Sequence, residues 1–206
     1  MMKPWRNLIV CAILFSSPLI VKSVIAAQTA ETFTKIDLAL QAVRQGYGIP
    51  TGIEFSNADA DNTPIILDLS VKDPAALFES IALQRPAYVW KLEGGIYELY
   101  PKATPERVSD MGIALYYVND ATPQEASDAI TRLPELQRWL SDHHAMRSEI
   151  VLGPRWGEHS EQTKISLELH NVPLRAILNQ LFSKVGSNGW SIARWGDKKQ
   201  FLAINF

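Results

Sequence analysis

Two stretches of the chain, one hundred positions apart, alternate apolar and polar residues in the same way. Residues 65–69 and 165–169 each place an Ile or Leu at every second position, and Asp68 and Glu168 fall on the opposite side. A period of two is typical of a strand with one buried face. The pattern therefore predicts a half-buried strand in each stretch, with both acidic side chains turned toward solvent.

Each predicted strand is followed by apolar residues at helical spacing. Asp73 as N-cap and Pro74 at the first helical position mark the start of the first helix, and Asn171 and Pro173 introduce the second. A spacing of i, i+1, i+4, i+5 predicts one buried helix face. The matching apolar positions are Leu77, Phe78, Ile81 and Ala82 in the first helix and Ile177, Leu178, Leu181 and Phe182 in the second.

A tryptophan opens a predicted hairpin after each helix. Trp90 and Trp190 are followed by turn signals at 94–95 and 196–197, so each stretch is expected to form a β-α-β-β unit with its Trp in the core. Such patterns also arise by chance. Here helix start, apolar face, Trp and hairpin coincide at one constant offset without a gap, which favours a repeated unit. Two copies are too few for a solenoid, so we expect two similar small domains.

Shorter signals predict the remaining elements. In the first half, apolar spacing predicts a helix from residue 36 that ends near Gly46 or Gly48, followed by a strand at 51–56. The second half is expected to contain a strand at 112–118, a helix that starts at a capping box of Thr122 and Glu125, a short helix from Pro134, and a strand at 148–153.

The predicted fold class is α+β, with two small helix-on-sheet domains that share the repeated unit. Residues 101–110 are charged, contain two prolines and lack periodicity, which indicates a linker. The expected organisation is a signal peptide at 1–27, a first α+β domain at 28–100, a linker at 101–110 and a second α+β domain at 111–206.

The N-terminus has the pattern of a secretory signal peptide. Lys3 and Arg6 precede an apolar run at 8–21, and small residues suited to cleavage after Ala26 or Ala27 follow it. An uncleaved membrane anchor is the alternative, but a span needs roughly 20 apolar residues, and this run is shorter. We therefore expect an exported protein with a cleaved signal, located in the periplasm and without a membrane span after cleavage.

Cleavage changes the charge and the cysteine content of the chain. Removing residues 1–27 leaves 17 basic against 22 acidic residues, a net charge of −5, and takes away Cys11, the only cysteine. A mildly acidic protein has no basic field that would attract nucleic acid. The mature chain would also lack disulfides and depend on its hydrophobic core.

The first half resembles a known family. "QGYGIPTGIEF" and "PIILDLSVKDPAALFESIALQRPAYVWKLEGGIYELYP" are similar to the secretin and TonB short N-terminal domain over about residues 30–100. Residues 112–206, with "LYYVNDATPQEASDAI", more loosely resemble the helix-sheet modules that follow in secretin periplasmic regions. The resemblance implies an interaction surface in the periplasm. Secretins continue into an outer-membrane barrel and this sequence shows none, so we do not expect pore formation.

The sequence contains few groups that suggest chemistry. Common nucleophile, phosphate-binding, dinucleotide and zinc-protease motifs are absent, and we expect no enzyme activity, cofactor or metal. Two acidic pairs, Asp59 with Asp61 and Glu158 with Glu161, could act as acid-base pairs, so an unrecognised hydrolase stays an alternative. The loop at 57–62 also has the spacing of a few calcium ligands, although it lacks the Gly and distal Glu of an EF-hand.

Two Arg-Trp pairs are the candidate binding residues. Arg155 with Trp156 and Arg194 with Trp195 lie beside glycines in predicted turns, and Trp and Arg are enriched at binding hot spots. The alternative is that each Trp folds back over the core of the second domain. We expect a non-enzymatic interaction or adaptor module of a bacterial envelope assembly, with a protein partner that the sequence does not identify. A periplasmic protein that binds a small molecule or glycan is the main alternative.

Overall fold

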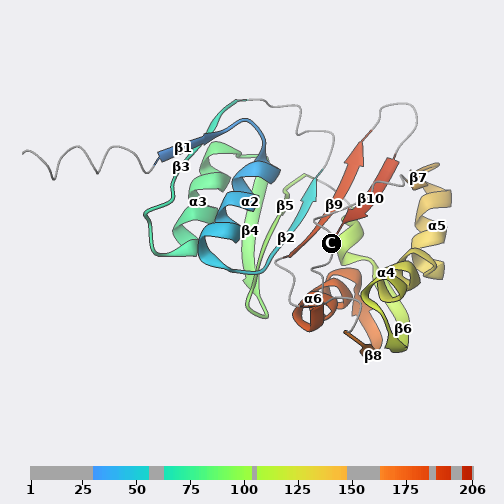
Figure 1. Ribbon diagram of the computed structural model, residues 1–206. Coiled ribbons are helices and arrows are strands. Elements are labelled where there is room, and N and C mark those ends of the chain that lie inside the picture. The colour runs from blue at the N-terminus through green and yellow to red at the C-terminus, as the bar shows by residue number, and fades with distance from the viewer. Residues whose placement is uncertain are drawn as a thin grey trace, which may run out of the picture.

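The computed structural model describes residues 30–55, 63–103, 106–147, 163–185, 189–195 and 201–205. The chain folds into mixed helix and sheet (Figure 1), so the predicted α+β class is confirmed. The strand expected at 148–153 and the turn expected at 196–197 lie outside the described residues.

The first half contains two helices and five strands. In chain order they are β1 (Ala30–Phe33), α2 (Ile36–Tyr47), β2 (Thr51–Phe55), β3 (Ile65–Asp68), α3 (Pro74–Gln84), β4 (Tyr88–Glu93) and β5 (Ile96–Pro101). Local signals fix the helix ends. The Asp73 side chain accepts a hydrogen bond from the amide of Ala75 at the start of α3, and Gly48 ends α2 in the left-handed conformation with φ 62°.

The second half begins with a short 3-10 helix, η2 (Val108–Asp110). It continues with β6 (Gly112–Ala121), α4 (Pro123–Thr131), α5 (Pro134–Asp142), β7 (Met146–Arg147), β8 (Ile165–Pro173), α6 (Leu174–Val185), β9 (Gly189–Trp195) and β10 (Phe201–Asn205). The predicted capping box is confirmed, since Thr122 and Glu125 exchange both hydrogen bonds. The sequence patterns did not predict β1, β7 or η2.

One six-stranded sheet runs through both halves, in the order β4-β5-β2-β9-β10-β7. Two antiparallel two-stranded ribbons, β1-β3 and β6-β8, lie outside it. The halves meet where β2 pairs in parallel with β9. A sheet shared between the halves was not predicted from the sequence. That residues 28–100 fold on their own stays a prediction, as does a repeated unit, although both halves contain a β-α-β-β order of elements.

The helices of the two halves pack on opposite faces of this sheet, α2 and α3 on one side and α6 on the other (Figure 1). Alternation along β2 explains the arrangement, because successive side chains of a strand point to opposite faces. Ile53 belongs to the core formed with α2 and α3. Its neighbour Gly52 instead pairs with Trp190, which belongs to the core formed with α6.

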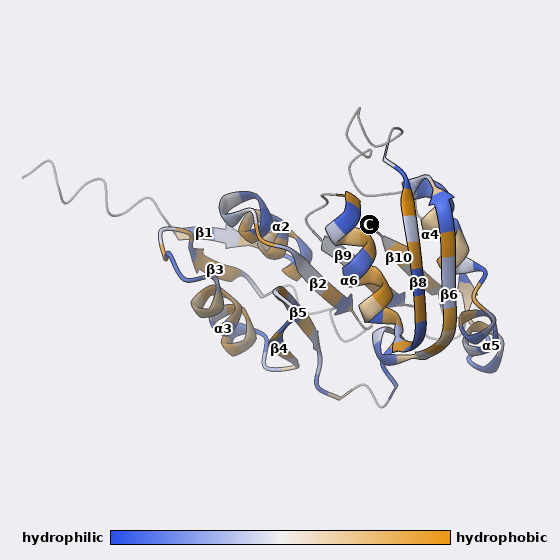
Figure 2. Ribbon diagram, turned by 90° about the horizontal axis from the view of Figure 1, so that it is seen from below, coloured by the Kyte–Doolittle hydropathy of each residue, from blue (hydrophilic) through white to orange (hydrophobic). Residues whose placement is uncertain are grey.

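Two hydrophobic cores result, one in each half. The predicted helix faces are confirmed, since Leu77, Phe78 and Ile81 are buried in one core and Ile177, Leu178, Leu181 and Phe182 in the other. Trp190 is also buried, whereas Trp90 is only half-buried against its core. Figure 2 shows the β6-β8 ribbon lengthwise, with hydrophobic and hydrophilic residues alternating along its strands.

The segment expected to be a linker is partly packed. Pro101 is the last residue of β5, and Val108 and Ser109 of η2 are buried. No helix among the described residues is long and apolar enough to cross a membrane.

Candidate functional site

The two halves meet at a close backbone approach between β2 and β9. Thr51 pairs with Gly189 and Gly52 pairs with Trp190. A Cβ on Gly189 would lie 1.9 Å from the carbonyl oxygen of Thr51, and its φ of +142° is strained for any other residue. A Cβ on Gly52 would lie 2.4 Å from Cζ2 of Trp190. A side chain at either position would therefore force the two strands or the Trp190 ring to shift.

Arg44, near the end of α2, bonds to both strands of the junction from the face of β2 opposite the Trp190 ring. Its guanidinium donates to the Thr51 hydroxyl and, at 3.2 Å each, to the carbonyl oxygens of Thr51 and Trp190. Burial lowers the pKa of Arg44 to about 10. The side chain thus stays charged at neutral pH and bonds to both strands of the junction.

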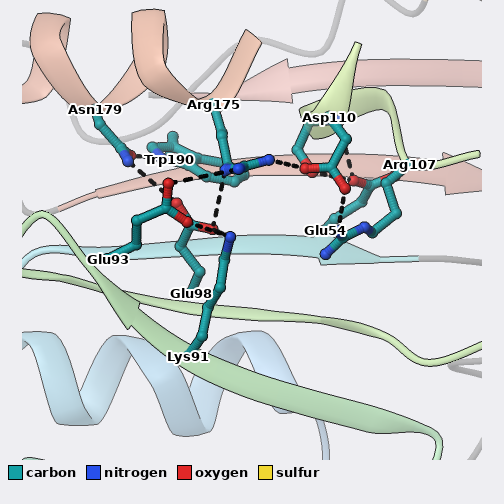
Figure 3. A network of polar contacts seen from close by, with 10 residues as sticks. Glu54, Lys91, Glu93, Glu98, Arg107, Asp110, Arg175, Asn179 and Trp190 are labelled. Atoms are coloured by element: carbon teal, nitrogen blue, oxygen red, sulfur yellow. Dashed lines mark hydrogen bonds and ion pairs between the residues drawn. The ribbon is translucent and has the colours of Figure 1, made fainter. Parts of the chain in front are cut away.

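Glu54 is fully buried and holds the connection between the halves. Its carboxylate accepts hydrogen bonds from the amides of Val108 and Ser109, at 2.9 and 3.1 Å, and from the Ser109 hydroxyl at 2.6 Å. A buried carboxylate is stable only where such donors replace water. Glu54 therefore holds η2 against the face of β2 on which Gly52 also lies (Figure 3).

Glu98 on β5 is buried on the same face and bonds to α6. It accepts from Asn179 Nδ2 at 3.1 Å and pairs with Lys91 Nζ at 3.3 Å. Asn179 in turn accepts from the indole Nε1 of Trp190 at 2.7 Å. Since Asn179 and Trp190 belong to the second half, this chain of bonds joins the two halves through their buried polar groups.

Arg175 at the start of α6 reaches three acidic side chains. Its guanidinium pairs with Asp110, with Glu93 at 3.4 Å and with Glu98 at 3.8 Å (Figure 3). A hydrogen bond from Lys91, aided by the charge of Arg175, lowers the pKa of Glu93. The acidic groups at this interface each have a cationic or hydrogen-bonding partner, which is the arrangement of a structural contact.

A groove of about 650 Å³ opens beside this network, where the end of β5, the connecting segment and α5 meet. It is lined by Tyr100, Pro101, Lys102, Glu106, Arg107, Asp110, Met111 and Trp139. Arg107 lies over the Tyr100 ring, 4.0 Å from its centroid, and pairs with Asp110. The groove thus combines two aromatic rings with charges of both signs.

Trp139 is the largest side chain in the groove wall. His143 stacks on its ring with centroids 4.2 Å apart, and His143 Nε2 lies 3.2 Å from a Glu106 oxygen. Trp139 Nε1 is buried without a hydrogen-bond partner among the described residues. Neither Trp139 nor Tyr100 was singled out by the sequence analysis, because an aromatic residue at helical or strand spacing is most simply explained as core.

The structure places one of the four candidate binding residues beside this groove. Arg194 lies on β9 rather than in a turn, with its Cζ 5.8 Å from the Trp139 ring centroid and its Nε 4.0 Å from Glu54 Oε1. Trp195 is the last residue of the same strand and pairs with Phe201. Arg155 and Trp156 lie outside the described residues, as do the acidic pairs at 59–61 and 158–161. A binding role for the four residues stays a hypothesis.

The outermost strands of the six-stranded sheet each carry an exposed large apolar side chain. Leu92 on β4 is 54% exposed and Met146 on β7 is 44% exposed. In the two ribbons, by contrast, side chains bond to backbone groups at the strand edges. The Gln84 amide bonds to both backbone groups of Ile66 on β3 at 2.8 Å, and Glu135 accepts from the Ala114 amide of β6. These side chains occupy positions that a further strand would take.

Within the described residues, no group of three or more His, Cys, Asp or Glu side chains could hold a metal ion. No family profile, curated protein or solved structure matches the chain.

Proposed function

We propose that this chain is an exported, non-enzymatic interaction module of a bacterial envelope assembly, in a secretin-, pilus- or TonB-like context. It acts in the periplasm after removal of residues 1–27. The observation that carries the proposal is the pair of outermost strands, β4 and β7, whose outer edges pair with no other strand among the described residues and each of which presents an exposed apolar side chain.

An open strand edge is a ready binding surface for another chain. Its unpaired N–H and C=O groups form main-chain hydrogen bonds with an added strand, and pockets for alternate side chains give specificity. Leu92 and Met146 add apolar surface at these edges. The resemblance of residues 30–100 to a periplasmic interaction domain supports the same role.

The polar groups at the interface between the halves support a module rather than an enzyme. Glu54 and Glu98 are buried and bonded to groups that hold the halves together. Catalytic acids and bases instead face a cleft where a substrate can reach them. The ionisable groups brought together here stabilise the fold that presents β4 and β7.

The groove at Tyr100 and Trp139 favours the second candidate function, binding of a small molecule or glycan. Its volume of about 650 Å³ is that of a typical ligand pocket, since these measure roughly 300–1,000 Å³. Aromatic rings with adjacent charged groups suit a ligand that has both apolar faces and polar substituents.

Pull-down from envelope extracts tests the proposal with matched variants. We expect the wild-type chain to retain a protein partner and Leu92→Lys to lose it, because a charge at an open edge opposes strand addition. Tyr117→Lys, at an exposed position on the β6-β8 ribbon, is the control and should keep the partner. Retention by Leu92→Lys, or loss only in Trp139→Ala, would contradict the edge as the binding surface and favour the groove.

A further inference from the structure

The groove at Tyr100 and Trp139 contains hydrogen-bond donors that the chain itself leaves unused. Lys102 is exposed in the groove wall, and its ammonium group has no partner among the described residues. Trp139 Nε1 is buried and also lacks an acceptor among them. Arg194, whose Cζ lies 5.8 Å from the Trp139 ring centroid, has a buried Nε that is likewise unbonded within the part of the chain that the structure describes. Three donors around one groove therefore remain for an acceptor from outside the chain.

The acidic side chains of the groove, in contrast, already have partners within the chain. One oxygen of Asp110 pairs with Arg107 and the other with Arg175. One oxygen of Glu106 lies 3.2 Å from Nε2 of His143. A cationic ligand would have to compete with these groups for the carboxylates, whereas an anion would meet donors without partners. The balance of contacts therefore favours a ligand with negative charge.

Glu54 does not satisfy the Arg194 side chain. Its Oε1 lies 4.0 Å from Arg194 Nε, which is longer than a hydrogen bond, and the carboxylate already accepts bonds from the amides of Val108 and Ser109. A buried donor without an acceptor costs free energy that an added acceptor recovers. The same holds for the indole N–H of Trp139. An anion beside these two side chains would therefore be stabilised by groups that otherwise destabilise the folded chain.

We infer that the groove binds an organic anion in which a carboxylate is attached to a flat apolar body. This inference rests on the second candidate function, because it names the ligand class of the same groove, and it does not depend on the open strand edges. The carboxylate accepts from the free donors, of which Lys102 is the accessible cation. The rings of Tyr100 and Trp139 and the side chain of Met111 provide the apolar contacts.

Two properties of the groove oppose a neutral glycan as its ligand. One face of each aromatic ring is already covered, that of Tyr100 by Arg107 and that of Trp139 by His143. A sugar ring can therefore stack only on the opposite faces. A carboxylate also balances the charge of Lys102 and forms a charge-assisted hydrogen bond with it, and such bonds are roughly twice as strong as neutral ones. Recognition in this groove thus depends more on charge than on stacking.

Nuclear magnetic resonance of the indole N–H groups tests this inference at the groove itself. The probe is hydrocinnamate, and its neutral counterparts are hydrocinnamide and maltotriose. We expect hydrocinnamate to shift the Trp139 Nε1–H signal, assigned with Trp139→Phe, in a saturable way, and hydrocinnamide to bind about tenfold more weakly. The signals of Trp90 and Trp190 are internal references, because their Nε1 groups already donate to Glu79 and Asn179.

Lys102→Met separates a charge contact from a structural role. The variant should bind hydrocinnamate about tenfold more weakly, since it removes one charge-assisted hydrogen bond, and it should bind hydrocinnamide as the wild-type chain does. Lys72→Met is the matched control, because Lys72 is an exposed lysine between β3 and α3 and does not line the groove. This control should bind all probes like the wild-type chain. Wild-type affinity of Lys102→Met for hydrocinnamate would overturn the inference.

The pattern of shifts separates the remaining outcomes. If hydrocinnamide or maltotriose moves the Trp139 signal at the same concentrations as hydrocinnamate, the anion is overturned and the second candidate function stands. A Trp139 signal that no probe moves would overturn both this inference and the second candidate function. Equal shifts of the Trp90 and Trp190 signals would mean binding without a defined site and would also overturn the inference. The proposal for the strand edges is decided separately, by the pull-down.

Discussion

The indole of Trp190 occupies the space that a side chain at Gly52 would need. A Cβ at position 52 would lie 2.4 Å from Cζ2 and 2.5 Å from Cε2 of this ring. Trp190 belongs to the core of the second half, and Gly52 lies on β2 of the first. This contact across the junction lets α6 of one half cover the sheet of the other, and it leads to the first prediction.

Gly52→Ala should destabilise the protein by about 1–3 kcal/mol, the usual cost of forcing extra atoms into a packed core. Gly46→Ala is the matched control, because nothing lies within 4 Å of its added Cβ in helix α2. That control should be stabilising by roughly 0.5–1 kcal/mol, since Gly is unfavourable inside a helix. Thermal melts of both variants decide, and equal melting temperatures would contradict the tight junction.

His144→Gly should stabilise the protein. His144 follows α5 with φ 47°, a left-handed conformation that glycine adopts more readily than other residues. We expect a gain of roughly 1 kcal/mol, the strain of one such residue. Gly48 has the same role after α2, with φ 62° and open space around it, so Gly48→Ala should cost about as much. Urea denaturation measures both, and a destabilised His144→Gly would show that the imidazole makes a contact worth more than the strain.

Arg175→Met should weaken the attachment of α6 to the first half. The substitution keeps the length of the side chain but leaves Glu98, which is 3% exposed, with one fewer cationic neighbour. We expect a loss of about 2–3 kcal/mol, because hydrogen bonds to charged groups contribute about 1.5–3 kcal/mol. A double-mutant cycle with Glu98→Gln is the control. Additive losses would mean that Arg175 and Glu98 do not interact.

Stability should fall on the acid side partly through Glu93. Its pKa is lowered in the folded state, chiefly by the hydrogen bond from Lys91. Between the folded and unfolded pKa values the unfolded chain binds more protons, so this contribution is present above the ordinary Glu pKa of about 4.3 and is lost as pH falls through the folded value. Denaturation curves at several pH values should show a shallower acid loss for Glu93→Gln. An unchanged slope would contradict this role for Glu93.

Local sequence signals sufficed for most helix starts and strand alternations. Asp73 and Thr122 act within three residues of themselves, so their hydrogen bonds follow from the sequence alone. The polar positions of the sheet strands were harder to place. Glu54 and Glu98 alternate with apolar residues and would face solvent in a sheet covered on one side. They are buried because their partners lie 54 and 81 positions away, on η2 and α6.

The same limit applies to the candidate site. The groove joins Tyr100 at the end of β5 to Trp139 on α5, and neither residue has a local signal that distinguishes it from a core aromatic. Arg194 was identified for its neighbour Trp195, whereas the structure shows its guanidinium over the ring of Trp139 on α5. Contacts between elements far apart in sequence depend on how the two halves are joined, and the β2–β9 pairing has no signature in either strand.

Amide hydrogen exchange along β4 tests most directly whether its open edge is a binding surface. The Lys91 amide, bonded toward β5, serves as the internal reference, and the Trp90 and Leu92 amides, which point away from β5, report on the edge. We predict that exchange at Trp90 and Leu92 slows when the protein partner retained in the pull-down is added, while exchange at Lys91 stays slow throughout. Exchange at Trp90 and Leu92 that stays rapid when the partner is bound would contradict a role of this edge in binding.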